Sequence, residues 1–207
     1  MGIKPSGILD GFDSGYAILQ LKESVDRRLH FLGFRQLADD LAMVPNIENY
    51  DVVYLKELPG DFKLQKGDLE KIYYIFNMER PEDYKGHSLS VGDIVAVKCS
   101  GKTEYHYVDS FGFVLLVDFD KPVVQIENYS CHLVDEFQLY DGNIMQVGNF
   151  MDSDREISYF AEVKSCDYFC EYDPRPSREE MEDDYIAEMA DRAVDEREAE
   201  IGAILGI

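Results

Sequence analysis

Alternating apolar and polar residues predict a series of short strands in the first 120 residues of the chain. Four segments are rich in β-branched and aromatic residues, which favour extended structure. They cover residues 15–23, 50–58, 91–98 and 103–108. The letters CSGK separate the last two segments, and Gly101 is free to adopt a positive φ in that turn. The last two segments are therefore predicted to form a hairpin.

Helical spacing interrupts this pattern twice. Residues 35–44 place Leu37, Leu41 and Val44 at helical intervals and end before a proline, which predicts a short helix. Residues 67–77 place apolar side chains on one helical face, which predicts a second helix.

From residue 113 onward, short apolar runs alternate with polar turns. The runs cover residues 113–119, 122–128, 132–140, 144–150 and 156–166. Turn residues such as Asp141-Gly142 separate them, which is typical of a meander of antiparallel strands.

The strand pattern stops at Pro174 and Pro176, and a helical pattern replaces it. Ser177 and Glu180 have the spacing of a capping box, in which each side chain bonds a backbone amide at the start of a helix. Apolar residues then recur at helical spacing, while the opposite face is heavily acidic. They are Met181, Tyr185, Ile186, Met189, Ala193 and Val194. This helix is expected either to lie on the sheet or to offer its apolar stripe to a partner.

These elements together predict an α+β fold. We expect one curved or barrel-like, mostly antiparallel sheet with two or three short helices and an acidic C-terminal helix, because short turns join the later strands. The predicted organisation is a lead-in at 1–14, a domain at 15–119, a β-meander extension at 120–173 packed on the same sheet, and an acidic amphipathic helix and tail at 174–207.

The net charge of the chain bears on which class of partner it could bind. The chain has 42 acidic and 20 basic residues among 207, and its net charge is −22. Residues 121–207 alone carry 22 acidic and 7 basic side chains. Such a field repels phosphate backbones, which argues against a nucleic-acid partner and favours a protein partner. An acidic surface also serves solubility alone, and composition does not separate the two roles.

No apolar run is long enough to cross a membrane, and the N-terminus lacks the apolar region of a signal peptide. The predicted location is therefore the cytoplasm, where cysteines are normally reduced. Cys131 and His132 could be combined with Cys166 and Cys170 as zinc ligands, but the usual C-x2-C spacing is absent. We expect no metal and no cofactor.

The segment from Gly86 to Phe113 concentrates residue types that occur in catalytic sites. Residues 86–90 lack the final glycine of a nucleophile elbow, because Ser90 stands in its place. His106 and Asp109 point to opposite faces of an extended strand, so they form no local triad with Ser110. A structural hairpin explains most of this segment, and its polar residues bond local backbone.

The same segment carries a family resemblance. The letters NMERPEDYKGHSLSVGDIV, followed by YVDSFGF, resemble the core of YodL-like domains, which occur in Firmicute proteins and are often encoded on conjugative elements. Tyr84 stands where the family pattern has phenylalanine. The resemblance covers about residues 15–119 and implies a cytosolic accessory protein with no established activity.

The resemblance implies a shared binding surface on the loop 80–90 and the turn 107–113. The candidate binding residues are Arg80, His87, Ser88, Ser90, Asp93, Tyr107, Asp109 and Phe111.

Three functional hypotheses follow. The first is a non-catalytic interaction protein that engages a DNA-binding partner through its acidic surface. The second is a small β-barrel that binds nucleic acid as PUA-like domains do, with aromatic side chains stacking on bases. The third is a hydrolase that uses His87, Ser88 and Asp109, and it requires these side chains to converge in a pocket.

Overall fold

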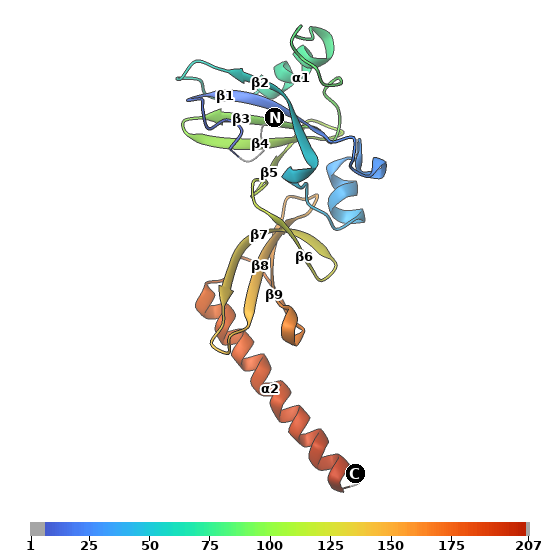
Figure 1. Ribbon diagram of the computed structural model, residues 1–207, viewed down its shortest axis with the longest axis vertical. Helices are drawn as coiled ribbons and strands as arrows, with labels where there is room; N and C mark the ends of the chain where they lie inside the picture. Colours follow the sequence, from blue (N-terminus) through green and yellow to red (C-terminus); the bar gives the residue numbers. More distant parts are fainter. Residues whose placement is uncertain (1–6, 206–207) are drawn as a thin grey trace.

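The computed structural model describes residues 7–205 and contains two five-stranded antiparallel sheets (Figure 1). Residues 1–6 of the expected lead-in and residues 206–207 of the expected tail lie outside the described residues. The mixed α+β class is confirmed, since a few helices, one of them C-terminal, accompany the sheets.

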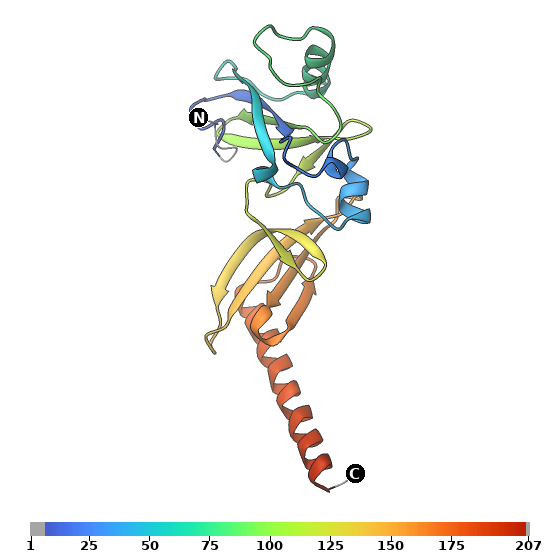
Figure 2. The ribbon, with the colours of Figure 1, turned by 45° about the vertical axis from the view of Figure 1, so that its right-hand side comes forward.

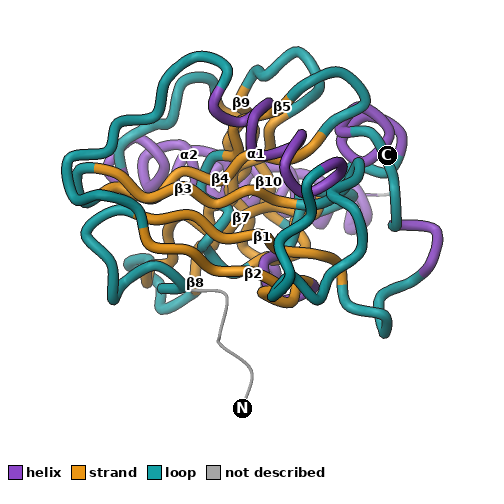
Figure 3. Tube along the Cα trace, turned by 90° about the horizontal axis from the view of Figure 1, so that it is seen from above, coloured by secondary structure: helices purple, strands orange, loops and turns teal. Residues whose placement is uncertain are grey.

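The first sheet contains the strands predicted between residues 15 and 119. They are β1 (Gly15–Leu21), β2 (Tyr50–Glu57), β3 (Ile94–Cys99), β4 (Lys102–Val108) and β5 (Phe113–Leu116). Their order is β2-β1-β3-β4-β5, and Figure 3 shows the first four side by side. The predicted hairpin joins β3 to β4, with Ser100 and Gly101 at φ of 52° and 80°. These positive values match the tight turn that such hairpins favour.

Helix α1 (Asp68–Met78) covers one face of the first sheet, as the spacing of its apolar residues predicts. Ile72 and Phe76 are buried on that face against Tyr16, Ile18 and Val95 of the sheet. The other predicted helix, at 35–44, is only a π-helical turn at Gln36–Asp40. Short 3-10 turns occupy Arg27–Leu29 and Ile47–Asn49.

The second sheet consists of consecutive strands in the order β10-β9-β8-β7-β6. They are β6 (Val123–Ile126), β7 (Tyr129–Gln138), β8 (Ile144–Met151), β9 (Ile157–Val163) and β10 (Tyr168–Tyr172). The sequence pattern placed the last strand at 156–166. The structure instead turns at Lys164–Cys166 and begins a further strand, because Asp167 adopts a left-handed φ of 55° that reverses the chain.

The structure differs from the expected single curved or barrel-like sheet. The later strands form a sheet of their own, and the sheets are not closed into a barrel. The chain leaves β5 through Asp118, which has a φ of 53°, and reaches β6 after Pro122. Proline has no amide hydrogen to donate to a strand ladder, which favours a break in the sheet there. The strands within residues 7–205 therefore do not form the barrel that the nucleic-acid hypothesis assumed.

A shared hydrophobic cluster joins the two sheets. Ile94 and Tyr107 of the first sheet belong to the same buried cluster as Phe150 and Phe160 of the second. Phe119, in the connection between the sheets, is 1% exposed within this cluster. Burial of the apolar surface of this cluster is the main force that holds the two sheets together.

Helix α2 (Arg178–Leu205) begins at the predicted capping box. Ser177 N donates to Glu180 Oε2 at 2.8 Å, and Glu180 N donates to Ser177 Oγ at 3.2 Å. Met181 and Tyr185 are each 1% exposed against the second sheet. The rest of the helix extends away from the body (Figure 2). No helix among residues 7–205 is long and apolar enough to cross a membrane.

Candidate functional site

The loop between α1 and β3 is organised around the side chain of Gln20, which is 3% exposed on β1. Gln20 Oε1 accepts the His87 amide at 3.0 Å, and Gln20 Nε2 donates to the His87 carbonyl at 3.1 Å. The same Nε2 donates to Asp93 Oδ2 at 2.9 Å. One buried amide therefore binds both ends of the loop. The sequence contains one signal for this role of Gln20, namely a polar residue among the apolar strand letters YAILQL. Sequence reasoning missed this signal.

Asp93 closes the loop from its other end. Its Oδ2 also accepts the Ser90 amide at 2.8 Å, and its Oδ1 lies 3.7 Å from His87 Nε2. Asp93 is only 3% exposed, and this burial raises the pKa of its carboxyl from near 3.8 to about 6. Desolvation disfavours the charged carboxylate, and the hydrogen bonds from Ser90 and Gln20 offset this only in part.

The raised pKa predicts a specific pH dependence of stability. Because folding raises the pKa of Asp93, the folded state binds more protons than the unfolded state between about pH 4 and 6. The contribution of Asp93 to stability is therefore full below pH 4 and is lost as the pH rises through 6. We expect Asp93→Asn, which mimics the protonated acid, to gain about 1–3 kcal/mol relative to the wild type between pH 4 and pH 7. Urea unfolding of both proteins across this range measures the difference, and parallel curves would contradict the assignment.

The other polar motif residues also bond the backbone of this loop. Asn77 Nδ2 donates to the Leu89 carbonyl at 3.0 Å, and Arg80 donates to the Gly86 carbonyl. The Arg80 guanidinium lies over the Tyr84 ring, 5.1 Å from its centre. A Cβ at Gly86 would come too close to Gln20 Oε1 and to the Tyr84 hydroxyl, so a larger residue here would force these side chains to shift.

His87 and the two serines lie at the outer side of the loop. His87 Nδ1 is 2.7 Å from the Ser88 carbonyl, and Ser90 Oγ donates to the same carbonyl at 2.8 Å. The side chain of His87 is 47% exposed. The Phe31 ring, whose residue is 63% exposed, lies 5.9 Å from the His87 ring. Sequence reasoning did not single out Phe31, because nothing in the local pattern connects it to His87.

The turn after β4 is fixed to an earlier part of the chain. Asp109 Oδ1 accepts the amides of Phe34 at 2.8 Å and Ser110 at 2.7 Å. Tyr107 Oη donates to the Leu32 carbonyl at 2.8 Å. Phe111, at the tip of this turn, is 97% exposed. Tyr107 and Asp109 thus hold the turn in place, while Phe111 is available to a partner.

A cavity of about 290 Å³ lies between α1 and this turn. Its lining includes Tyr73 of α1, Val91 at the end of the loop, and Asp109 and Ser110 of the turn. The structure therefore brings the loop 80–93 and the turn 107–113 to one end of the first sheet.

The three residues of the hydrolase hypothesis are not assembled as a catalytic unit. Within residues 7–205, no hydrogen bond or ion pair joins the side chains of His87, Ser88 and Asp109 to one another. The Asp109 carboxylate accepts backbone amides instead. A nucleophile and its base need a hydrogen-bonded contact, or one close to it.

The cysteines are also dispersed. Cys131 is buried in the cluster between the sheets, whereas Cys166 and Cys170 pack in the cluster beneath α2. His132 Nε2 lies 2.9 Å from the Pro45 carbonyl, to which it can donate. Within the described part of the chain, no group of three or more His, Cys, Asp or Glu side chains could hold a metal ion.

Comparisons with known proteins give one match. A family model described as YodL-like domain matches residues 15–119. These bounds enclose the whole first sheet, α1 and both motif loops, and they end where the chain leaves for the second sheet. No curated protein and no solved structure matches the chain.

Proposed function

The chain belongs to the family of YodL-like domains, and from this premise we propose that it is a non-catalytic interaction protein. In this proposal it is a cytoplasmic accessory protein of bacterial or mobile-element origin, which engages a DNA-binding partner through its acidic surface. One observation carries the proposal: the outer half of α2 is acidic, has exposed apolar side chains and projects from the body of the protein.

The attachment of α2 ends at Arg192. Its guanidinium donates to the carbonyls of Cys166 at 2.8 Å and Asp167 at 3.2 Å, in the turn before β10. Beyond Arg192, every side chain that the structure describes on this helix is exposed. We call this part, residues 193–204, the outer segment. A helix of this length gains most of its stability from tertiary packing, so an unpacked end favours a partner.

The outer segment has the composition of a docking helix. Val194, Ile201 and Ile204 are 56%, 47% and 81% exposed, and their spacing of seven and three places them along one face. Asp195, Glu196, Glu198 and Glu200 surround this stripe, with Arg197 as the single base. A second copy would bring acid against acid. A partner with an apolar and basic surface is complementary, and DNA-binding proteins present such basic surfaces.

The proposal is tested by capturing a partner with the full chain from nuclease-treated lysate of the source cells. We expect a basic protein whose retention falls as salt rises and which duplex DNA displaces at low salt. The variant V194S/I201S/I204S should retain at least about tenfold less of it, because the apolar contact is lost. Equal retention by this variant, or no displacement by DNA, would overturn the proposal.

The motif loops are the proposed surface that this chain shares with its family, because α2 lies outside the family match. The polar motif residues support the loops from within, and Phe111 is 97% exposed. The same capture experiment includes Phe111→Ala as a separate arm. Reduced retention of a partner by F111A would assign binding to these loops, and unchanged retention would leave the outer segment as the only contact.

A further inference from the structure

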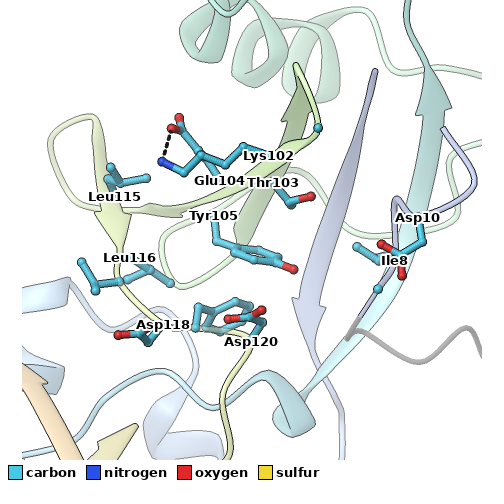
Figure 4. Close-up of a pocket in the computed structure, with 14 residues that line it drawn as sticks. Ile8, Asp10, Lys102, Thr103, Glu104, Tyr105, Leu115, Leu116, Asp118 and Asp120 are labelled. Atoms are coloured by element: carbon cyan, nitrogen blue, oxygen red, sulfur yellow. Dashed lines mark hydrogen bonds and ion pairs between the residues drawn. The ribbon is translucent and has the colours of Figure 1, made fainter. Parts of the chain in front are cut away.

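A further hollow lies beside the connection between the two sheets, away from the motif loops. It has a volume of about 610 Å³ and is formed by β4, β5, the connection 117–120 and the segment 7–10 (Figure 4). This volume falls within the range of sites that bind small organic molecules.

Two aromatic side chains form the inner wall. Tyr105 is 8% exposed and Phe119 is 1% exposed, and their ring centres are 5.0 Å apart. Figure 4 shows the Tyr105 ring reaching from β4 across the hollow, with its hydroxyl directed toward the segment of Ile8 and Asp10. Among residues 7–205 this hydroxyl forms no hydrogen bond with another group, and a tyrosine that is mostly buried normally finds a partner for its hydroxyl. The hydroxyl is therefore free to bond a ligand.

The rim is acidic. Among the residues that the structure describes, four carboxylates line the hollow, and Lys102 is the single cation. Lys102 Nζ is already bound to Glu104 Oε1 at 3.1 Å, and Asp118 Oδ2 accepts Asn149 Nδ2 at 2.6 Å. Asp10 and Asp120 have no ion pair among the described residues. Within residues 7–205, these two carboxylates thus form no pair with a basic side chain.

The negative charges of Asp10 and Asp120 influence the hydroxyl of Tyr105. The pKa of Tyr105 is raised to about 12, first by burial and then by the charges of Asp120 and Asp10. The negative electrostatic potential of these two carboxylates therefore extends from the rim of the hollow to Tyr105 on its inner wall. An anionic ligand is disfavoured there, and a cation with N–H donors is matched by carboxylates, a hydroxyl acceptor and aromatic faces.

We propose that this hollow binds an organic cation, a primary ammonium or a guanidinium. Its nitrogen lies between Asp10 and Asp120 and donates to Tyr105 Oη, while its carbon chain contacts the rings of Tyr105 and Phe119. The cation comes either from a free polyamine or from a lysine or arginine side chain of another protein. This inference is independent of α2, because all the described lining residues precede residue 121.

The test is isothermal titration calorimetry of the full chain at 150 mM salt. Spermidine and agmatine are the free probes, and the peptides Gly-Lys-Gly and Gly-Arg-Gly, blocked at both ends, represent protein side chains. We expect saturable 1:1 binding of at least one probe, with the dissociation constant raised tenfold or more in D10N/D120N and threefold or more in Tyr105→Phe. Preference for a free probe or a peptide identifies the source.

A matched control separates the site from the general field of an acidic protein. Glu196→Gln removes a charge from the exposed outer segment of α2, and its dissociation constant should stay within twofold of the wild type. Asp10 and Asp120 are exposed, so their variants should fold, and circular dichroism checks this. Absence of saturable binding by all four probes, or equal weakening in D10N/D120N and E196Q, would overturn the proposal.

Discussion

Replacing Phe76 by alanine is expected to lower the free energy of unfolding by about 3–5 kcal/mol, because the side chain is large and wholly buried. Phe76 is 0% exposed, and its ring lies 4.9 Å from that of Tyr54 and 4.7 Å from that of Tyr84. The ring therefore joins α1 to the first sheet and to the motif loop. Urea unfolding measures the loss.

Tyr74→Ala provides the control, since Tyr74 lies on the same helix and is 53% exposed. Its effect should stay within about 0.5 kcal/mol, as is usual for surface substitutions. Phe76→Ala should also loosen the motif loop, because Tyr84 loses its packing partner. We expect faster hydrogen exchange of the His87 and Ser90 amides, which are bonded to Gln20 and Asp93. Similar losses in the two variants would contradict this role of Phe76.

Replacing Met181 by alanine is expected to destabilise the attachment of α2 by about 2–5 kcal/mol, the range found for buried methionines. Met181 is 1% exposed in the cluster that includes Met145 and Val163 of the second sheet. The loss should appear as faster hydrogen exchange in residues 178–192 and in β8 and β9. Chemical unfolding gives its magnitude.

Val194→Ala is the matched control on the same helix. Val194 is 56% exposed and belongs to the outer segment, so the substitution should change stability by less than about 0.5 kcal/mol. A loss as large as that of Met181→Ala would mean that the outer segment packs on the body in solution. That result would also remove the basis for proposing a partner there.

These expectations divide α2 into two parts that the apolar pattern alone does not distinguish. Met181 and Val194 both belong to the helical stripe that the sequence predicts. Of these two, only Met181 packs on the second sheet, because the contacts between α2 and that sheet end at Arg192, which bonds the turn before β10. The first part of the helix therefore lies on the sheet, which is one of the two sequence alternatives, and the side chains described in the outer segment stay exposed.

The candidate site was only partly predictable. Arg80, His87, Ser90, Asp93 and Asp109 were identified from the motif. Their hydrogen-bond partners were not, because Gln20 is 73 residues from Asp93 and Phe34 is 75 residues from Asp109. The acidic hollow was missed for the same reason, since it combines Asp10 with Tyr105 and Asp120.

The sequence by itself determined the features that depend on neighbouring residues. It specified the strands through their β-branched and aromatic residues, the β3–β4 turn through Gly101, and the start of α2 through Ser177 and Glu180. Only the tertiary structure decided the break into two sheets, the engagement of the motif polar groups, and the free end of α2. The physical reason is the separation along the chain of the residues involved. A cap or a turn is complete within about four residues, whereas strand pairing and burial depend on surfaces that distant segments form together.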